Sequence, residues 1–291
     1  MTIDILQAFE REPPKLDFIW SGFLAGTVGA LVAPGATGKS FWALEAAMSI
    51  ACSVAGGDIA GIKPKPQKSG RVLYLAGEDP ESALTRRLFS LGQYLNADAR
   101  ASIAKNFEFI PIMGSRFDIM NAKQLESVIK MGTGTRLIIL DTLSRIHHLD
   151  ENSNGDMARL ISTLEHIAAE TGASVLYLHH VSKSSTWAGA TDQQQAARGA
   201  SVLVDNVRWC GYMARMTKNE AEKLSGRDDR QAIGARYCDF VRFGVSKQNH
   251  DMHILERWYK RDEGGVLLPV DLIETKPESR KDKKKEHRNE I

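Results

Sequence analysis

The chain has 291 residues, of which 43% are hydrophobic and 25% are charged, and this composition suits one globular domain with appendages. A formal net charge of +2 excludes any argument from overall charge, so a surface for a polyanion must be a local basic patch. Since the sequence has no membrane-length apolar window and no signal-peptide pattern, and Cys52, Cys210 and Cys238 lack metal or redox spacing, we expect a cytoplasmic protein with reduced thiols and no membrane contact.

A short amphipathic helix is predicted within residues 1–20. Ile3, Leu6 and Phe9 share one helical face, and Glu12-Pro13-Pro14 ends the helix. So short a helix is marginal unless its apolar face packs on something. Packing on its own domain and docking on a neighbouring subunit are both open.

A phosphate-binding loop is predicted at residues 33–40. The apolar run Thr27–Val32 precedes it and the helical pattern Phe41–Met48 follows it, so an ordinary tight turn is the weaker interpretation. Backbone N–H groups and the helix N-terminus would hold the α- and β-phosphates of ATP, Lys39 would reach the γ-phosphate, and Ser40 would ligate Mg²⁺. The predicted nucleotide-binding residues are Pro34, Gly35, Ala36, Thr37, Gly38, Lys39 and Ser40, after Ala33 in place of the usual glycine.

Acidic residues follow two later predicted strands. Glu78 comes after the buried strand Arg71–Ala76, where we expect it to orient and deprotonate the attacking water. Asp79 is instead expected to cap the helix Glu81–Tyr94. A second apolar strand ends at Asp141, and this carboxylate is expected to hold the Mg²⁺ shell.

Histidines mark the next two segments. Residues 143–156 contain His147 and His148, which lack partner ligands at metal-binding spacing, so we expect a solvated loop before a helix over 157–169. The buried strand Ser174–Leu178 then ends in His179-His180. His180 is predicted to sense the γ-phosphate; a hydrogen-bonded core histidine is the alternative.

Residues 181–199 show little apolar periodicity, and a loop of this length inside a domain is usually functional or disordered. Lys183 and Arg198 supply cations and Trp187 an aromatic ring, as on a sparse surface for single-stranded DNA. Arg145, in the preceding polar loop, is the third candidate for DNA binding.

Strands dominate the rest of the chain. A turn of helix and a strand are predicted over 201–213, and a hairpin over 256–268 turns at Asp262–Gly265. The order of elements predicts an α/β fold whose mainly parallel sheet is covered by helices and extended by antiparallel C-terminal strands. We therefore expect an N-terminal helix and arm over 1–20, an ATPase domain over 21–270 and a basic disordered tail over 271–291.

A mobile guanidinium for the transition state is missing from the predicted site. Arg208 would supply it to the next subunit's nucleotide, and Lys247 is the second candidate. A head-to-tail interface of this kind closes into a ring.

These segments resemble the RepA-type hexameric replicative helicases of mobilisable broad-host-range plasmids, within the RecA-like P-loop ATPases. The resemblance covers about residues 3–268, and the tail does not match. Its residues are the N-terminal helix with Pro13-Pro14, Gly26–Val32, Pro34-Gly35, Gly38-Lys39-Ser40, Glu78-Asp79-Pro80, Leu140–Leu143, His179-His180, Asp192–Gln195, Arg198-Gly199, Ser201–Asn206, Arg208-Trp209 and Val241–Lys247.

The resemblance implies a homohexameric ring that hydrolyses ATP with Mg²⁺, moves 5′→3′ on single-stranded DNA and unwinds forked duplexes, with a plasmid initiator and a primase as partners. It assigns phosphate, metal, base, sensor and finger roles to Lys39, Ser40, Asp141, Glu78, His180 and Arg208. A RecA-like regulatory or scaffold ATPase and a recombination ATPase that coats single strands are the alternatives.

Overall fold

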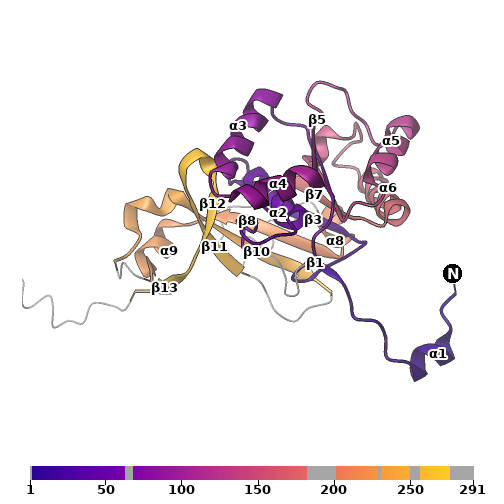
Figure 1. The fold of residues 1–291 in the computed structure, drawn as a ribbon, viewed down its shortest axis with the longest axis horizontal. Helices are drawn as coiled ribbons and strands as arrows, with labels where there is room; N and C mark the ends of the chain where they lie inside the picture. Colours follow the sequence, from indigo (N-terminus) through magenta and orange to yellow (C-terminus); the bar gives the residue numbers. More distant parts are fainter. Residues whose placement is uncertain (1, 63–67, 182–200, 228–230, 250–255, 276–291) are drawn as a thin grey trace, which may run out of the picture.

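The computed structural model describes residues 2–62, 68–181, 201–227, 231–249 and 256–275 (Figure 1). Within this part of the chain, nine strands form one central sheet. They are β3 (Val28–Ala33), β4 (Val72–Ala76), β5 (Phe107–Pro111), β6 (Leu137–Asp141), β7 (Ser174–His180), β8 (Trp209–Arg215), β10 (Phe240–Gln248), β11 (Glu256–Arg261) and β12 (Leu267–Val270).

The strand order is β12-β11-β10-β8-β3-β7-β6-β4-β5. All neighbours from β8 to β5 pair in parallel, whereas β10, β11 and β12 extend the sheet by antiparallel pairing. The predicted parallel sheet with an antiparallel extension, including the hairpin of β11 and β12, is confirmed.

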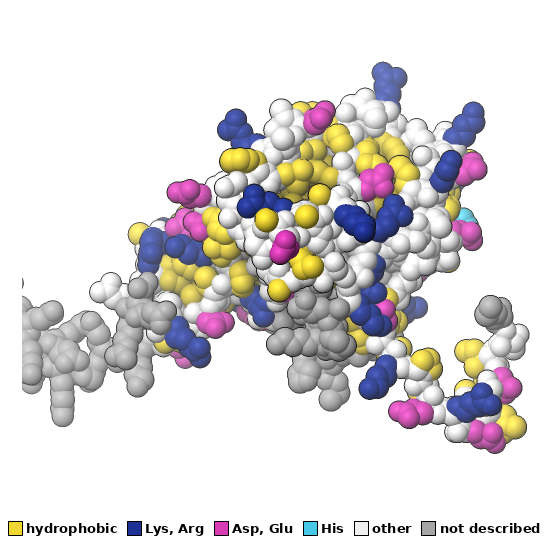
Figure 2. All heavy atoms as spheres, viewed as in Figure 1, with side chains coloured by type: hydrophobic (Ala, Val, Ile, Leu, Met, Phe, Trp, Pro, Cys, Tyr) yellow, Lys and Arg dark blue, Asp and Glu magenta, His cyan; other side chains and the backbone are white. Residues whose placement is uncertain are grey.

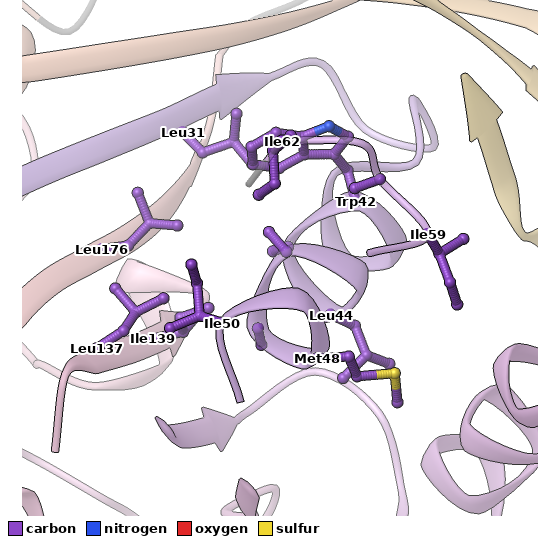
Figure 3. Close-up of a cluster of buried hydrophobic side chains, with 14 of the residues drawn as sticks. Leu31, Trp42, Leu44, Met48, Ile50, Ile59, Ile62, Leu137, Ile139 and Leu176 are labelled. Carbon is purple, nitrogen blue, oxygen red and sulfur yellow. The ribbon is translucent and has the colours of Figure 1, made fainter. Parts of the chain in front are cut away.

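Helices cover both faces of the sheet, because alternate strand residues point to opposite sides. Leu31, Leu137 and Leu176 pack on one side against α2 (Figure 3). Val32, Ile138 and Val175 pack on the other side against α6. The first face is covered by α2 (Lys39–Ala51), α3 (Glu81–Gly92) and α4 (Ala97–Asn106), and the second by α5 (Ala122–Gly132), α6 (Asn154–Thr171) and α8 (Ser201–Asp205).

A smaller unit packs at the antiparallel end of the sheet, around Met216, Ala221, Ile233 and Phe240. Thr217 and Glu220 form the predicted capping box at the start of its helix. Its elements are α9 (Lys218–Lys223), β9 (Leu224–Gly226), the 3-10 helix η4 (Gly234–Asp239) and β13 (Leu272–Glu274).

The N-terminal arm is fixed at its base and free of its own domain at its tip. A hairpin of β1 (Phe18–Trp20) and β2 (Phe23–Leu24) places Trp20 between Trp42 and Trp209, with ring centroids 5.8 and 5.5 Å away. The helix α1 (Ile5–Glu10) lies away from the body, and none of its residues is buried (Figures 1 and 2). Packing of this helix on its own domain is therefore wrong for the described residues.

Three local predictions are corrected by long-range contacts. Asp79 does not cap α3, because its carboxylate pairs with Arg87 at 2.6 Å and Pro80 takes the cap position. The helix α6 begins at Asn154, capped by Ser153, rather than at residue 157. His147 is buried, and its Nδ1 accepts the N–H of Leu149, so this histidine is not solvated.

Glu45 is a buried acid in the middle of α2. Its Oε1 accepts the backbone N–H of Leu267 at 2.8 Å, while Oε2 has no hydrogen-bond partner among the described residues. Burial raises the pKa of Glu45 to about 8. Because the folded state favours the protonated acid, the stability tied to this group is present below pH 4.5, its ordinary pKa, and is lost as the pH rises toward 8.

Replacing Glu45 by glutamine should therefore flatten the pH dependence of stability. The amide keeps an acceptor for Leu267, while wild type loses on the order of 3 kcal/mol between pH 4.5 and 7, at about 1.36 kcal/mol per pH unit. Urea unfolding at pH 5 and pH 8 measures this, with Glu165→Gln, an exposed position on α6, as control. Equal pH profiles for wild type and Glu45→Gln would contradict a neutral buried Glu45.

No helix in the described part of the chain is long and apolar enough to cross a membrane.

Candidate nucleotide site

Four adjacent strands bring the predicted catalytic side chains to one edge of the sheet. The strands β3, β7, β6 and β4 are neighbours and run in parallel. The phosphate-loop residues follow β3, while His180 and Asp141 end β7 and β6, and Glu78 follows β4. Carboxyl ends of parallel strands are where α/β proteins bind ligands.

The phosphate loop has the backbone that the sequence predicts. Gly38, with φ of 104°, leads into α2, and Ala36 also adopts a left-handed conformation with φ of 59°. Lys39 begins the helix, is 3% exposed, and its Nζ has no hydrogen-bond partner among the described residues. Burial lowers the pKa of Lys39, against the opposing charges of Asp141 and Glu78. A buried ammonium without a partner is costly, and phosphate oxygens would satisfy it.

Ser40 and Asp141 lie together at the predicted metal position. The Ser40 hydroxyl donates to Asp141 Oδ1 at 3.1 Å, and the Tyr74 hydroxyl donates to Oδ2 at 2.7 Å. Burial raises the pKa of Asp141, while Lys39 opposes that shift. A hydroxyl and a carboxylate are oxygen ligands that fit Mg²⁺, which commonly takes its other ligands from water and substrate phosphates.

Glu78 is hydrogen-bonded to the predicted sensor. His180 Nε2 lies 2.9 Å from Glu78 Oε1, and the Thr142 hydroxyl donates to the same oxygen at 3.1 Å. The His180 hydrogen bond is the main cause that lowers the pKa of Glu78 to about 2. Glu78 is therefore an ionised carboxylate at neutral pH, and His180 is partly exposed rather than a core histidine.

Two adjoining cavities lie along the phosphate loop. The first measures about 270 Å³ and is lined by the loop together with Glu78, His180 and Arg261. Phe41 and Arg87 line both cavities, and the Arg87 guanidinium stacks 5.2 Å from the Phe41 ring centroid. The second measures about 450 Å³ and is lined by Phe41, Ser82, Ala83, Arg86, Arg87, Ser90 and Gly264.

Sequence reasoning missed Tyr74, Arg87 and Arg261. A tyrosine inside the buried run Arg71–Ala76 was the available signal for Tyr74, because a buried hydroxyl needs a partner. Nothing in the local sequence marks the two arginines.

Arg208 lies at the opposite edge of the sheet from the loop. It immediately precedes β8, whose last residue Arg215 donates to the Ala36 carbonyl at 2.9 Å. The seven residues of β8, at about 3.3 Å each, separate the two ends by roughly 20 Å. Arg208 is exposed and does not line the cavity at its own phosphate loop.

Lys247 lies beside the same edge but is engaged. Its Nζ donates to the carbonyls of Val204 at 3.4 Å and Asp205 at 2.5 Å, at the end of α8. Lys247 thus holds the segment that leads into Arg208.

The candidate DNA-binding residues are only partly covered by the structure. Lys183, Trp187 and Arg198 lie outside the described residues. Arg145 is exposed at the end of the 3-10 helix η1 (Leu143–Arg145), and its Cβ lies 2.6 Å from where a side chain on Gly77 would begin. Arg145 therefore packs beside the strand end that carries Glu78.

A central strand leading into a phosphate loop, with carboxylates at neighbouring strand ends, defines a P-loop NTPase. The chain belongs to the AAA domain family, whose model matches residues 3–186.

Two solved structures share the fold. One is an isolated ATPase domain, which aligns with a TM-score of 0.56 at 11% identity, over 92% of this chain and 96% of that chain. The other is a DnaB-like replicative helicase, from a structure of its interactions with primase, which aligns with a TM-score of 0.60 at 12% identity, over 92% of this chain and 67% of that chain. These matches confirm the predicted RecA-like α/β fold.

Proposed function

We propose that the protein is a DNA helicase that hydrolyses ATP at the interfaces of a homohexameric ring. The observation that carries the proposal is the division of one site between two edges of the sheet. Lys39, Glu78 and His180 gather at one edge, and Arg208 lies at the other. Subunits arranged head to tail would bring the two edges together, and such an arrangement closes into a ring.

The phosphate loop would bind ATP, with the base entering the cavity beside Phe41 and Arg87. Ser40 and Asp141 would hold Mg²⁺ against the phosphates, where the ion neutralises developing charge. Lys39 would neutralise the β- and γ-phosphates from the other side.

Glu78 would orient the attacking water. A carboxylate with a pKa of about 2 is a weak base, since general bases work best near the operating pH. When His180 turns from Glu78 to the γ-phosphate, the main cause of that low pKa is removed, and Glu78 becomes the stronger base. ATP binding would in this way switch the catalytic base on.

Arg208 would act as the finger for the neighbouring subunit's ATP, and Lys247 would hold its segment in place. The arm would dock on a neighbour as well, because Ile3, Leu6 and Phe9 expose 74%, 66% and 83% of their surface. Both contacts support one ring-forming interface.

DNA would pass the ring's central channel, where Arg145, Lys183 and Arg198 are the proposed contacts. One solved structure with this fold is that of a DnaB-like replicative helicase and its interactions with primase. On that likeness we propose single-stranded and forked DNA, a primase and a plasmid initiator as partners, with 5′→3′ movement and a role in plasmid replication.

Phosphate release with and without single-stranded DNA, followed by strand displacement on a forked duplex, tests the function. We expect DNA to stimulate hydrolysis, displacement to require ATP, and native mass spectrometry with nucleotide to give six copies. Rings that hydrolyse ATP without displacing a strand would indicate a scaffold ATPase. Open filaments on single strands would indicate a recombination ATPase.

A further inference from the structure

Two arginines contact the outer side of the phosphate loop from within the same subunit. Arg215 ends β8 and donates to the Ala36 carbonyl at 2.9 Å. Arg261 ends β11 and donates to the next carbonyl, that of Thr37, at 3.1 Å. Because β11 and β8 are both antiparallel to β10, their carboxyl ends lie at the same edge.

The two arginines differ in their relation to the cavity. Arg261 lines the 270 Å³ cavity together with Gly38, Lys39 and Phe41, whereas Arg215 does not line it. The Arg261 Nη2 would lie 3.2 Å from a Cβ on Gly38, so its guanidinium covers the loop where the helix begins. Gly264, three residues further on, lines the second cavity. Arg261 therefore lies where the two cavities meet.

Arg261 also lacks a neutralising partner. Within the described residues no ion pair joins Arg261 or Arg215 to a carboxylate, and each bonds a neutral carbonyl. Burial and the charge of Arg215 lower the pKa of Arg261, with Asp239 and Glu45 opposing. Glu45, with a pKa of about 8, is itself neutral at pH 7. Two uncompensated guanidinium groups repel each other at a partly buried site, and an anion in the cavity would remove that cost.

We infer that Arg261 binds the α,β-diphosphate of the nucleotide held by its own subunit, as a second cation beside Lys39. Loop N–H groups hold these two phosphates, and the planar fork of arginine suits phosphate oxygens. Glu78 and His180 occupy the hydrolytic end of the cavity, so the γ-phosphate belongs there and Arg261 serves the end toward the base. The inference rests on the proposed function only in that the site binds a nucleotide.

Binding of ADP, of inorganic pyrophosphate and of adenosine to the full-length chain tests the inference by calorimetry and competition. Arg261→Ala should weaken ADP and pyrophosphate at least tenfold and leave adenosine unchanged. Arg261→Gln, which keeps a donor for the Thr37 carbonyl without the charge, should show the same loss. Arg215→Ala is the matched control, since it removes an equivalent carbonyl contact outside the cavity, and it should change ADP affinity less than threefold.

Equal losses in Arg215→Ala and Arg261→Ala, or full affinity in Arg261→Gln, would overturn the inference, because Arg261 would then only prop the loop. The outcome is separate from the helicase proposal. A wild-type chain that binds ADP but neither hydrolyses ATP nor unwinds DNA would refute that proposal while the role of Arg261 is still measured. A wild-type chain that does not bind ADP would refute both.

Discussion

Lys39→Ala should abolish ATP hydrolysis, to below about 1% of the wild-type rate. The Lys39 ammonium is buried, begins the helix after the phosphate loop and has no hydrogen-bond partner among the described residues. Neutralising the phosphates is therefore its main use, and alanine removes it. Phosphate release with saturating Mg²⁺ and ATP is the measurement. Lys130→Ala, at an exposed position on α5, is the control and should retain wild-type activity.

Stability separates this loss from unfolding. A buried ammonium is costly for the protein, so its removal should leave the melting temperature of the nucleotide-free chain unchanged or raise it. Added ADP should raise the melting temperature of wild type but not of Lys39→Ala. More than a tenth of wild-type hydrolysis in Lys39→Ala would contradict the assignment of the site.

The sequence predicted the parts of the site that depend on local pattern. The apolar runs before Ser40 and Asp141 set the strands, and parallel strands place their carboxyl ends at one edge. Gly38 and Lys39 could be placed for the same reason, because turn and helix follow each other in the chain. The convergence of Lys39, Glu78, Asp141 and His180 follows from topology alone.

Contacts between distant residues could not be predicted. Tyr74 meets Asp141 across 67 residues, and Arg261 meets Thr37 across 224. Asp79 has the sequence of a helix cap but pairs with Arg87, because a charged partner one turn or more along α3 outweighs a cap that Pro80 already occupies. His147 was assigned to solvent by its polar neighbours, whereas packing against the sheet buries it.

Arg208→Ala should lower the rate of hydrolysis by roughly 10³ to 10⁵, the range for removal of an arginine finger supplied by a neighbour. Nucleotide affinity should stay within about threefold of wild type, because Arg208 lies a full strand away from its own phosphate loop. Arg159→Ala, an exposed position on α6, is the control. Loss of ADP binding in Arg208→Ala would point to a structural role instead.

Mixing two inactive variants decides whether Arg208 acts on the neighbour. In a ring, a Lys39→Ala subunit still offers its Arg208, and an Arg208→Ala subunit still offers its phosphate loop. Where the two meet in the right order, one complete site forms, so an equal mixture should recover activity at about a quarter of its interfaces. Neither variant alone should hydrolyse ATP. Mixed rings seen by native mass spectrometry but without recovered hydrolysis would place Arg208 outside the shared site, because two edges brought together in one interface cannot fail to complement.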